Sequence, residues 1–282
     1  MVTPPQCENI AVRLVPVQPD DADAGNVAVI TFNRPTRANA LSAPAYVDWL
    51  KCMNWAAEEA SVRVVMLTGN GRFYCSGQEL SPASLAGENA QAALREAGQV
   101  TEKLVDCFID FPKLLIAAVN GPSYGFGATH LALCDAVYVA PSASMKTPFM
   151  ELGFCAECCS SYLFPKIMGQ SLANELILMG RQLNAEEMVH AHMASRLLPS
   201  ENFFDRVLEL ALEAARLPPN AIRQSKALVR SEQERQLLKE VNHREMKLLI
   251  ERMLSEECHQ AVVQFLTKQQ RLKRAASKSS KL

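Results

Sequence analysis

A continuous apolar run that leads into a glycine-rich turn, Leu114 to Asp135 (LLIAAVNGPSYGFGATHLALCD), constrains the fold of this chain most. The run LLIAAV is typical of a strand that is buried on both faces. The sequence NGP ends this strand because proline lacks an amide hydrogen, and a helix-compatible run follows the sequence GFG. A strand, a tight turn and a helix start leave backbone N–H groups unpaired, so this turn can hold a developing negative charge. An ordinary strand-to-helix turn of an α/β core fits these residues equally well.

Composition and charge narrow the class of protein. The chain has 282 residues, 49% of them hydrophobic and 21% charged, which is typical of a globular protein. A formal net charge of −1 does not favour general binding to nucleic acids or anionic membranes. No apolar stretch is long enough to cross a bilayer, and the N-terminal sequence MVTPPQCENI does not resemble a secretory signal. We therefore expect neither a nucleic-acid partner nor membrane insertion.

Strand and helix patterns alternate through the first 200 residues. The expected strands are 12–17, 27–32, 62–68, 114–119 and 136–140, the expected helices are 42–60, 92–108, 160–168 and 171–179, and the expected irregular segments are 81–91 and 142–159. From 201 to 270 the pattern is helical almost throughout, with a break at Pro218-Pro219. We therefore predict an α/β core at 1–200, a helical C-terminal region at 201–272 and a flexible polar tail at 273–282.

The nine cysteines are scattered through apolar segments, so we expect free thiols and not disulfides. Cys155, Cys158 and Cys159 form the one group that merits a test as a metal site. No second pair and no histidine stands at ligand spacing from them, so we predict no metal.

The last three residues of the chain are Ser280-Lys281-Leu282. This tripeptide at a C-terminus is a peroxisomal address that an import receptor reads. The preceding polar sequence KRAASKS would leave the address accessible. We therefore predict delivery to the peroxisomal matrix, with the import receptor as a partner.

Two glycine-containing turns follow two apolar strands, at Cys75 to Gln78 and at Tyr124 to Gly127. Each turn could offer a backbone N–H to one oxygen atom. Neither is a dinucleotide-binding fingerprint, because the spacing GxGxxG is missing, and no GK[ST] sequence follows that would make a phosphate-binding loop.

Three motifs in order, RPTRANAL at 34–41, FYCSGQEL at 73–80 and NGPSYGFGATHLALCD at 120–135, resemble the enoyl-CoA hydratase/isomerase (crotonase) superfamily. The similarity covers roughly residues 8–272. The sequence AECCSSYLFPKIMG at 156–169 is similar to the Δ3,Δ2-enoyl-CoA isomerase branch of peroxisomes. The resemblance implies a crotonase-like spiral of repeated ββα units, a homotrimer or hexamer, an acyl-CoA thioester as substrate, and no cofactor beyond the coenzyme A of the substrate.

The resemblance also implies the catalytic groups. The backbone N–H groups of Gln78 and Phe126 would form an oxyanion hole for the thioester oxygen, where preorganised donors stabilise the charge that develops when an adjacent carbon is deprotonated. Hydratases of the superfamily carry two glutamates, and this chain has Thr129 and Phe149 at those positions. The isomerase branch uses one glutamate, which here is Glu157.

Glu157 lies among apolar residues and thiols, so desolvation would raise its pKa and strengthen it as a base. A solvated acid at a helix N-terminus is the alternative interpretation. Nearby Glu151 does not match the register of the hydratase carboxylate, and we interpret it as a loop or structural acid. His130 stands on an apolar helix face, which indicates a buried, hydrogen-bonded histidine and not a catalytic one.

Residues around these motifs are expected to bind the substrate. Arg37 would meet the phosphates of coenzyme A, and Lys268 in the last helix would reach those of a neighbouring subunit. Backbone groups of Ala40 and Leu41 would lie along the pantetheine–adenine arm. The remaining expected substrate-binding residues belong to the two turns or their flanks: Ser76, Gly77, Gln78, Glu79, Leu80, Gly125 and Phe126, with the loop 81–95 lining the acyl tunnel beside Leu80 and Phe126.

The resemblance therefore predicts an isomerase that converts 3-cis- or 3-trans-enoyl-CoA to 2-trans-enoyl-CoA in the breakdown of unsaturated fatty acids. Glutamate-mediated proton transfer from C2 to C4 requires one carboxylate and no activated water. Two alternatives remain: another activity of the superfamily, such as hydration or dienoyl isomerisation, and a non-catalytic module that binds acyl-CoA or a protein.

Overall fold

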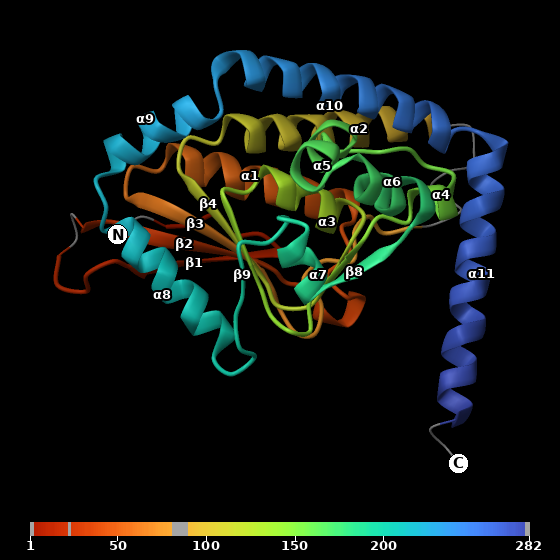
Figure 1. Ribbon diagram of the computed structural model, residues 1–282, viewed down its shortest axis with the longest axis horizontal. Helices are drawn as coiled ribbons and strands as arrows, with labels where there is room; N and C mark the ends of the chain where they lie inside the picture. The colour runs from red at the N-terminus through yellow and green to blue at the C-terminus, as the bar shows by residue number, and fades with distance from the viewer. Residues whose placement is uncertain (1–2, 22–23, 81–89, 280–282) are drawn as a thin grey trace.

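The structure is a computed structural model that describes residues 3–21, 24–80 and 90–279. Within these residues the main sheet has six strands in the order β1-β2-β3-β4-β6-β9 (Figure 1). Only β1 runs antiparallel to its neighbour, and the other pairs are parallel. The strands of this sheet are β1 (Ile10–Pro16), β2 (Asn26–Phe32), β3 (Val62–Gly69), β4 (Leu114–Val119), β6 (Ala136–Val139) and β9 (Arg196–Leu197).

Helices cover both faces of this sheet, which explains why its central strands are apolar at nearly every position. In β3, Val65 and Leu67 pack into the core beneath α1 and α2, whereas Val64 and Met66 face the opposite way, toward α8. Figure 1 shows α1 and α2 above the sheet and α8 below it. The helices involved are α1 (Ala43–Glu58), α2 (Ala90–Asp110) and α8 (Phe203–Ala215).

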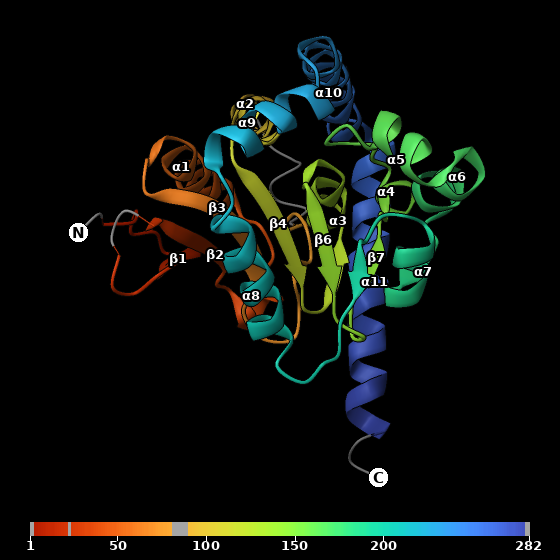
Figure 2. The same ribbon diagram turned by 60° about the vertical axis from the view of Figure 1, so that its left-hand side comes forward.

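A smaller sheet in the described residues joins β5 (Pro122–Tyr124), β7 (Ser144–Lys146) and β8 (Gln182–Asn184). Three helices, α5, α6 and α7, lie together next to this sheet (Figure 2). The helices on this side are α3 (Phe126–Thr129), α4 (Phe149–Leu152), α5 (Ser160–Met168), α6 (Gln170–Met179) and α7 (Ala185–His190), with short 3₁₀ helices η2 (Pro35–Arg37) and η4 (His130–Leu133).

The prediction of an irregular segment at 142–159 is wrong in two places, because β7 and α4 lie within it. Strand β7 has three residues and α4 is a single helical turn, and such short elements leave no periodic pattern in a sequence. Pairing of β7 with β5 and β8 forms this strand, which is a contact between distant parts of the chain.

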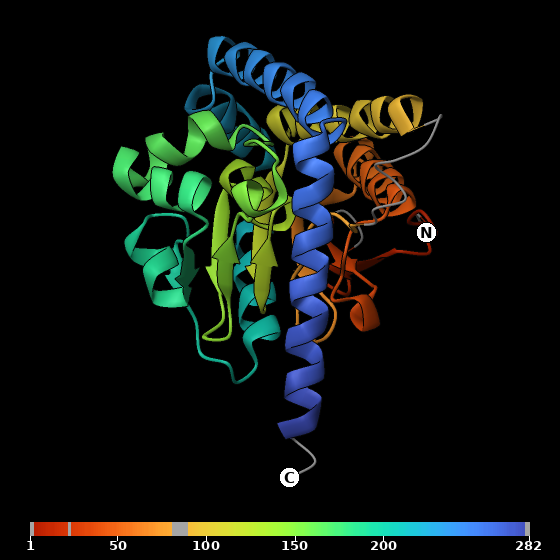
Figure 3. The ribbon, with the colours of Figure 1, turned by 90° about the vertical axis from the view of Figure 1, so that its right-hand side faces the viewer.

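The C-terminal region is helical, as predicted, and consists of α8, α9 (Pro219–Val229), α10 (Glu232–Met253) and α11 (Glu256–Ser279). Helix α10 packs along α2, and the first part of α11 packs against α4. Figures 1 and 3 show α11 continuing past the rest of the molecule toward the C-terminus. Helix α11 continues through Ser279 into the segment 273–282, which we predicted to be a flexible polar tail; the sequence KRAASK is rich in good helix formers. The tripeptide 280–282 lies outside the described residues, as does most of the loop predicted at 81–91.

In the ranges 3–21, 24–80 and 90–279, no helix is both long enough and apolar enough to cross a membrane.

Candidate active site

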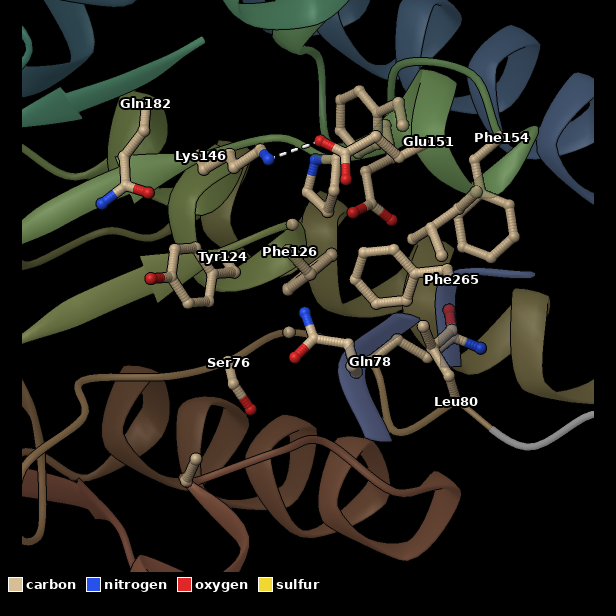
Figure 4. A pocket seen from close by; sticks show the side chains of 18 of the residues that line it. Ser76, Gln78, Leu80, Tyr124, Phe126, Lys146, Glu151, Phe154, Gln182 and Phe265 are labelled. Carbon is tan, nitrogen blue, oxygen red and sulfur yellow. Dashed lines mark ion pairs between the residues drawn. The ribbon is translucent and has the colours of Figure 1, made fainter. Parts of the chain in front are cut away.

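The two glycine turns come together at one cavity of about 520 Å³, which residues of the smaller sheet also line (Figure 4). Most of its wall is apolar, and carboxylate, amide, ammonium and hydroxyl groups converge on it from five parts of the chain. The lining residues are Ala38, Phe73, Ser76, Gly77, Gln78, Leu80, Tyr124, Gly125, Phe126, Lys146, Pro148, Phe149, Glu151, Leu152, Phe154, Glu157, Gln182, Phe265 and Gln269.

The first turn is held close to the second by its glycine. Gly77 has a φ of +79°, and a Cβ at this position would stand 2.5 Å from the carbonyl oxygen of Tyr124. A residue with a side chain could not adopt this backbone without pushing the two turns apart. The bond from the Leu41 amide to the Gly77 carbonyl, 2.8 Å long, and the bond from the Glu79 amide to the Leu41 carbonyl, 2.9 Å long, fix the segment that carries Gln78.

The second turn starts helix α3. Gly125 precedes the helix with a φ of +51°, and its amide donates to the carbonyl of Lys146 at 3.0 Å. Tyr124 donates its amide to the carbonyl of Cys75 at 2.9 Å, which ties the second turn to the first. Among the described residues, neither the Gln78 amide nor the Phe126 amide has a hydrogen-bond acceptor. Two free N–H groups therefore lie on adjacent turns that line one cavity, as an oxyanion hole requires.

A buried hydrogen bond between the side chains of Tyr74 and His130 connects the same two segments. The carbonyl of Phe126 can only accept, so Nδ1 of His130, 2.8 Å away, carries the proton. Nε2 of His130 then accepts from the hydroxyl of Tyr74 at 2.9 Å. Burial lowers the pKa of His130 to about 4 and keeps the ring neutral. The prediction that His130 is a buried, hydrogen-bonded histidine is confirmed.

Glu157 brings a carboxylate to the second turn. Only 8% of this residue is exposed, which rules out the interpretation as a solvated acid. Its Oε1 atom lies 3.8 Å from the position that a Cβ would take at Gly125, so the carboxylate faces the turn that carries the Phe126 amide. Burial, and to a smaller extent the nearby carboxylate of Glu245, together raise the pKa of Glu157 to about 8. Such a group can accept and return a proton near neutral pH.

The two positions where hydratases carry glutamates differ in their surroundings. Phe149 lines the cavity, whereas Thr129 is fully buried and does not line it. Glu151 also lines the cavity and forms an ion pair with Lys146, which Figure 4 shows across the upper wall. This pairing supports the interpretation of Glu151 as a structural acid.

A second cavity of about 200 Å³ lies between α1, α2 and α10 and shares Gln78 and Glu157 with the first. Its remaining wall is almost entirely apolar: Leu41, Ala43, Tyr46, Ala93, Leu94, Ala97, Gly98, Met246, Leu249, Ile250 and Met253, with Glu79 and Thr101 as the polar members. The carboxylate of Glu157 and the segment of Gln78 therefore stand where the two cavities meet.

The structure brings some predicted substrate residues to the main cavity and not others. Ser76, Gly77, Leu80 and Gly125 line it together with the proposed catalytic groups. Of the described residues that were predicted to bind substrate, five do not line it: Arg37, Ala40, Leu41, Glu79 and Lys268.

Local contacts explain the position of three of these residues. The Arg37 side chain is 62% exposed and pairs with Glu79, which also accepts from Arg34 at 2.9 Å. These arginines, Arg37 first, lower the pKa of the Glu79 carboxyl, and the two ion pairs tie Glu79 to the segment of Arg34 and Arg37. Leu41 uses its amide and carbonyl on the first turn, and its side chain lines the second cavity. Lys268 is exposed on α11.

Several lining residues were not predicted, and Phe265 and Gln269 of α11 are the most distant in sequence. They are four residues apart and therefore lie on one face of the helix. The amphipathic pattern of the last helix predicts that this face is covered, but it does not predict which part of the protein covers it. Lys146 and Gln182 come from β7 and β8, which the sequence did not predict.

All nine cysteines are free thiols. Within the described part of the chain, no three His, Cys, Asp or Glu side chains are grouped so that they could hold a metal ion.

Comparison with known proteins gives a consistent result. The sequence profile described as "Enoyl-CoA hydratase/isomerase" matches residues 22–273. The chain is 39% identical over 248 residues to "Enoyl-CoA delta isomerase 2" of Rattus norvegicus, a match that covers 88% of this chain and 63% of that protein. It is 38% identical over 247 residues to "Enoyl-CoA delta isomerase 3, peroxisomal" of Mus musculus, covering 88% of this chain and 77% of that one. The chain thus spans about 63% of the length of the rat relative.

Among solved structures, an enoyl-CoA hydratase/isomerase from Pseudoalteromonas atlantica superimposes with a TM-score of 0.80 at 29% sequence identity. The superposition covers 93% of this chain and 98% of the bacterial chain. The similarity therefore extends over the core and most of the helical C-terminal region.

Proposed function

The chain belongs to the enoyl-CoA hydratase/isomerase family and has its crotonase-like fold, as the sequence predicts, and on that premise we propose that it is a Δ3,Δ2-enoyl-CoA isomerase. It would convert 3-cis- or 3-trans-enoyl-CoA to 2-trans-enoyl-CoA during the β-oxidation of unsaturated fatty acids. The observation that carries this proposal is the buried carboxylate of Glu157 on the main cavity, which faces the turn of Gly125 with a pKa raised to about 8.

The proposed reaction consists of two proton transfers, from the substrate to Glu157 and from Glu157 back to the substrate. The carboxylate of Glu157 removes a proton from C2 of the substrate, and the electrons of the C–H bond move onto the thioester oxygen to give a dienolate. The N–H groups of Gln78 and Phe126 hold that oxygen while it is charged. Protonated Glu157 then donates its proton to C4, the double bond forms between C2 and C3, and the carboxylate is regenerated. No metal, flavin or nicotinamide takes part.

The same geometry favours isomerisation over hydration. Addition of water needs a second group to activate the water molecule, and the two hydratase positions carry Thr129 and Phe149. The other carboxylate on the main cavity, Glu151, is paired with Lys146. One free base suits a reaction in which the proton that leaves C2 returns at C4.

The two cavities suggest how the substrate lies. With the thioester at the amides of Gln78 and Phe126, the larger, partly polar cavity would hold the pantetheine arm, and the smaller, apolar cavity would hold the acyl chain. Arg37 and Lys268 stay candidates for the phosphates of coenzyme A, Arg37 because its side chain is exposed near the first turn and Lys268 because it is exposed on α11.

The decisive experiment replaces Glu157 with Gln and measures isomerisation of 3-enoyl-CoA and hydration of 2-enoyl-CoA. We expect kcat for isomerisation to fall by about 10³-fold or more, because the side chain keeps its size but cannot accept a proton. Glu151→Gln is the matched control, since it removes a carboxylate from the same cavity, and it should lose far less activity.

Other outcomes would favour the alternatives. Equal losses in both variants would contradict the assignment of Glu157 as the base. Faster hydration than isomerisation by the unaltered protein would indicate a hydratase. No turnover together with tight binding of acyl-CoA would indicate a non-catalytic binding module.

We also propose that the protein is delivered to the peroxisomal matrix through Ser280-Lys281-Leu282, an interpretation that the name of the mouse relative supports. Removal of these three residues should leave a fluorescently labelled protein in the cytosol. Continued import would count against the signal.

A homotrimer or a hexamer is the proposed assembly. Leu228 and Val229 on α9 are each 83% exposed, which is unusual for large apolar side chains and suits burial by another subunit. Light scattering on the purified protein should give three or six times the mass of one chain, and a monomer would contradict the proposal.

A further inference from the structure

Glu245 on α10 is a buried carboxylate that takes no part in the reaction described above. Only 7% of it is exposed. Its Oε2 atom accepts from the amide of Cys159 at 2.7 Å, and its Oε1 atom accepts from the amide of Ser161 at 2.9 Å. Both oxygens therefore bind the backbone immediately after Glu157, although the two segments lie more than 80 residues apart in the sequence.

The segment that Glu245 binds is a strained turn. Cys158 and Cys159 have φ values of +57° and +60°, and two successive left-handed residues other than glycine are unfavourable. Cys159 is also the N-cap of α5, and its side chain makes no capping bond. The carboxylate of Glu245 supplies the missing acceptor for the first turn of α5, as a capping side chain would, but from another helix.

Further contacts tie α10 to this turn. The Cys159 thiol donates to the carbonyl of Leu238 at 3.2 Å, and the Cys155 thiol donates to the carbonyl of Glu245 at 3.8 Å. One face of α10 thus holds the turn on both sides of Glu157. Loss of the carboxylate would release the turn from its two strongest bonds, because hydrogen bonds to a charged acceptor are the stronger kind.

Glu245 is also the main charged group near Glu157. The other titratable groups that face Glu157 are the hydroxyl of Tyr46 on α1 and the thiols of Cys75, Cys155 and Cys158. Burial raises the pKa of every one of them, so they are neutral at physiological pH.

Of the two carboxyls, Glu245 is the one that ionises first. Burial raises the pKa of both Glu157 and Glu245, but the two amide donors of Cys159 and Ser161 favour the charged form of Glu245. Among the described residues no donor binds the carboxylate of Glu157. A charged Glu245 then disfavours charge on Glu157, and this makes Glu157 the stronger base.

We propose that Glu245 is a positioning residue for the reaction: its carboxylate holds the strained turn that carries Glu157, and its negative charge increases the basicity of Glu157. This inference rests on the proposed function, because it assigns to Glu157 the role of the base. It also connects the helical C-terminal region to the chemistry of the core.

The test compares Glu245→Gln with Asn242→Ala. Asn242 is buried on the same helix and donates to Asp106 of α2 at 2.9 Å, so its loss weakens the packing of α10 without touching the turn. In Glu245→Gln we expect the acid limb of the kcat/KM profile to move to lower pH by about one unit, and kcat at high pH to fall by about tenfold or more, with KM changed by less than threefold. In Asn242→Ala the limb should stay where it is.

Glu245→Asp is the second variant, and it keeps the charge on a shorter side chain. The acid limb of this variant should stay near that of the unaltered protein while its kcat falls. This result would separate the effect of the charge of Glu245 from the effect of its hydrogen bonds to the turn. An unmoved acid limb in Glu245→Gln, with stability lost as in Asn242→Ala, would overturn the proposal and leave Glu245 a structural residue. If Glu245→Gln does not fold, a kcat in Glu245→Asp equal to that of the unaltered protein would overturn the proposal that the carboxylate of Glu245 positions the turn.

A readout that needs no turnover separates this inference from the proposed function. The carboxyl infrared band of Glu157, identified by its absence in Glu157→Gln, can be titrated in the resting protein. If the unaltered protein does not isomerise 3-enoyl-CoA but the titration still moves in Glu245→Gln, the proposed function fails and the coupling of the two carboxyls stands. If the protein is active and the titration does not move, the coupling fails.

Discussion

The approach of the two glycine turns makes Gly77→Ala the sharpest test of the proposed oxyanion hole. At a φ of +79° an alanine costs about 1–2 kcal/mol in backbone energy. Its Cβ would also stand 2.5 Å from the carbonyl oxygen of Tyr124, so the two turns would have to separate by roughly 0.5–1 Å. The amides of Gln78 and Phe126 lie on those two turns, and one of them would leave hydrogen-bond distance of the thioester oxygen.

Loss of one oxyanion donor costs about 10²–10³ in kcat, or about 2.7–4 kcal/mol in transition-state stabilisation. We therefore expect kcat for 3-enoyl-CoA isomerisation to fall by about 100-fold or more in Gly77→Ala. Gly169→Ala is the matched control, because Gly169 has a φ of +80° but nothing lies within 4 Å of its Cβ position. That variant should lose stability of the same order in urea unfolding and keep its kcat within about twofold.

A kcat in Gly77→Ala within about threefold of that in Gly169→Ala would refute the reasoning. The backbone cost would then be the whole effect, and the contact between the turns would not set the geometry of the donors.

Three more predictions follow from the buried groups and the second cavity. For the unaltered protein, kcat/KM should rise as pH increases through about 8, since Glu157 acts as a base only when it is ionised; a profile flat from pH 6 to 9 would contradict this. The pKa of His130 is about 4 in the folded state and near 6.5 in the unfolded state, so between these pH values the unfolded chain binds more protons. The free energy of unfolding should therefore fall by about 3 kcal/mol as the pH is lowered from 6.5 to 4. In His130→Leu, urea unfolding should show a smaller change over this pH range. Ile250→Ala enlarges the apolar cavity and should raise kcat/KM for long acyl chains relative to short ones by about tenfold.

The two turns and the burial of Glu157 were predictable because their signals are local. A strand followed by a glycine turn and a helix start is legible in the residues around Gly125, and a carboxylate among thiols and apolar side chains indicates that Glu157 is buried. The helix at 43–58 and the strands of the main sheet, except the two-residue β9, were likewise predictable from their periods and their breaks. Each of these inferences uses residues less than twenty positions apart.

The contacts that complete the site were not predictable from periodicity. Glu245 appears in the sequence as one more acid on a highly charged helix, and only the packing of α10 on α2 and α5 turns it toward the turn of Cys159. Phe265 lines the cavity because α11 packs against α4, which lies far away in the sequence. The ion pair between Arg37 and Glu79 was likewise not predictable from periodicity, since it depends on a turn that lies 42 residues away.

The absence of a second catalytic acid leads to a final prediction at Phe149, which is buried and lines the main cavity. An isomerase of the proposed kind needs one group that accepts a proton and returns it. A further carboxylate on this cavity would add to the effect of Glu245 and keep Glu157 protonated up to a higher pH. In Phe149→Glu the acid limb of isomerisation should therefore move to higher pH, and the rate at pH 7 should fall accordingly. Phe149→Gln is the control, because it places a side chain of the same size there without the charge. Coincident acid limbs in the two variants would mean that position 149 does not act on Glu157 through charge, and that the apolar ring at this position matters only for its shape.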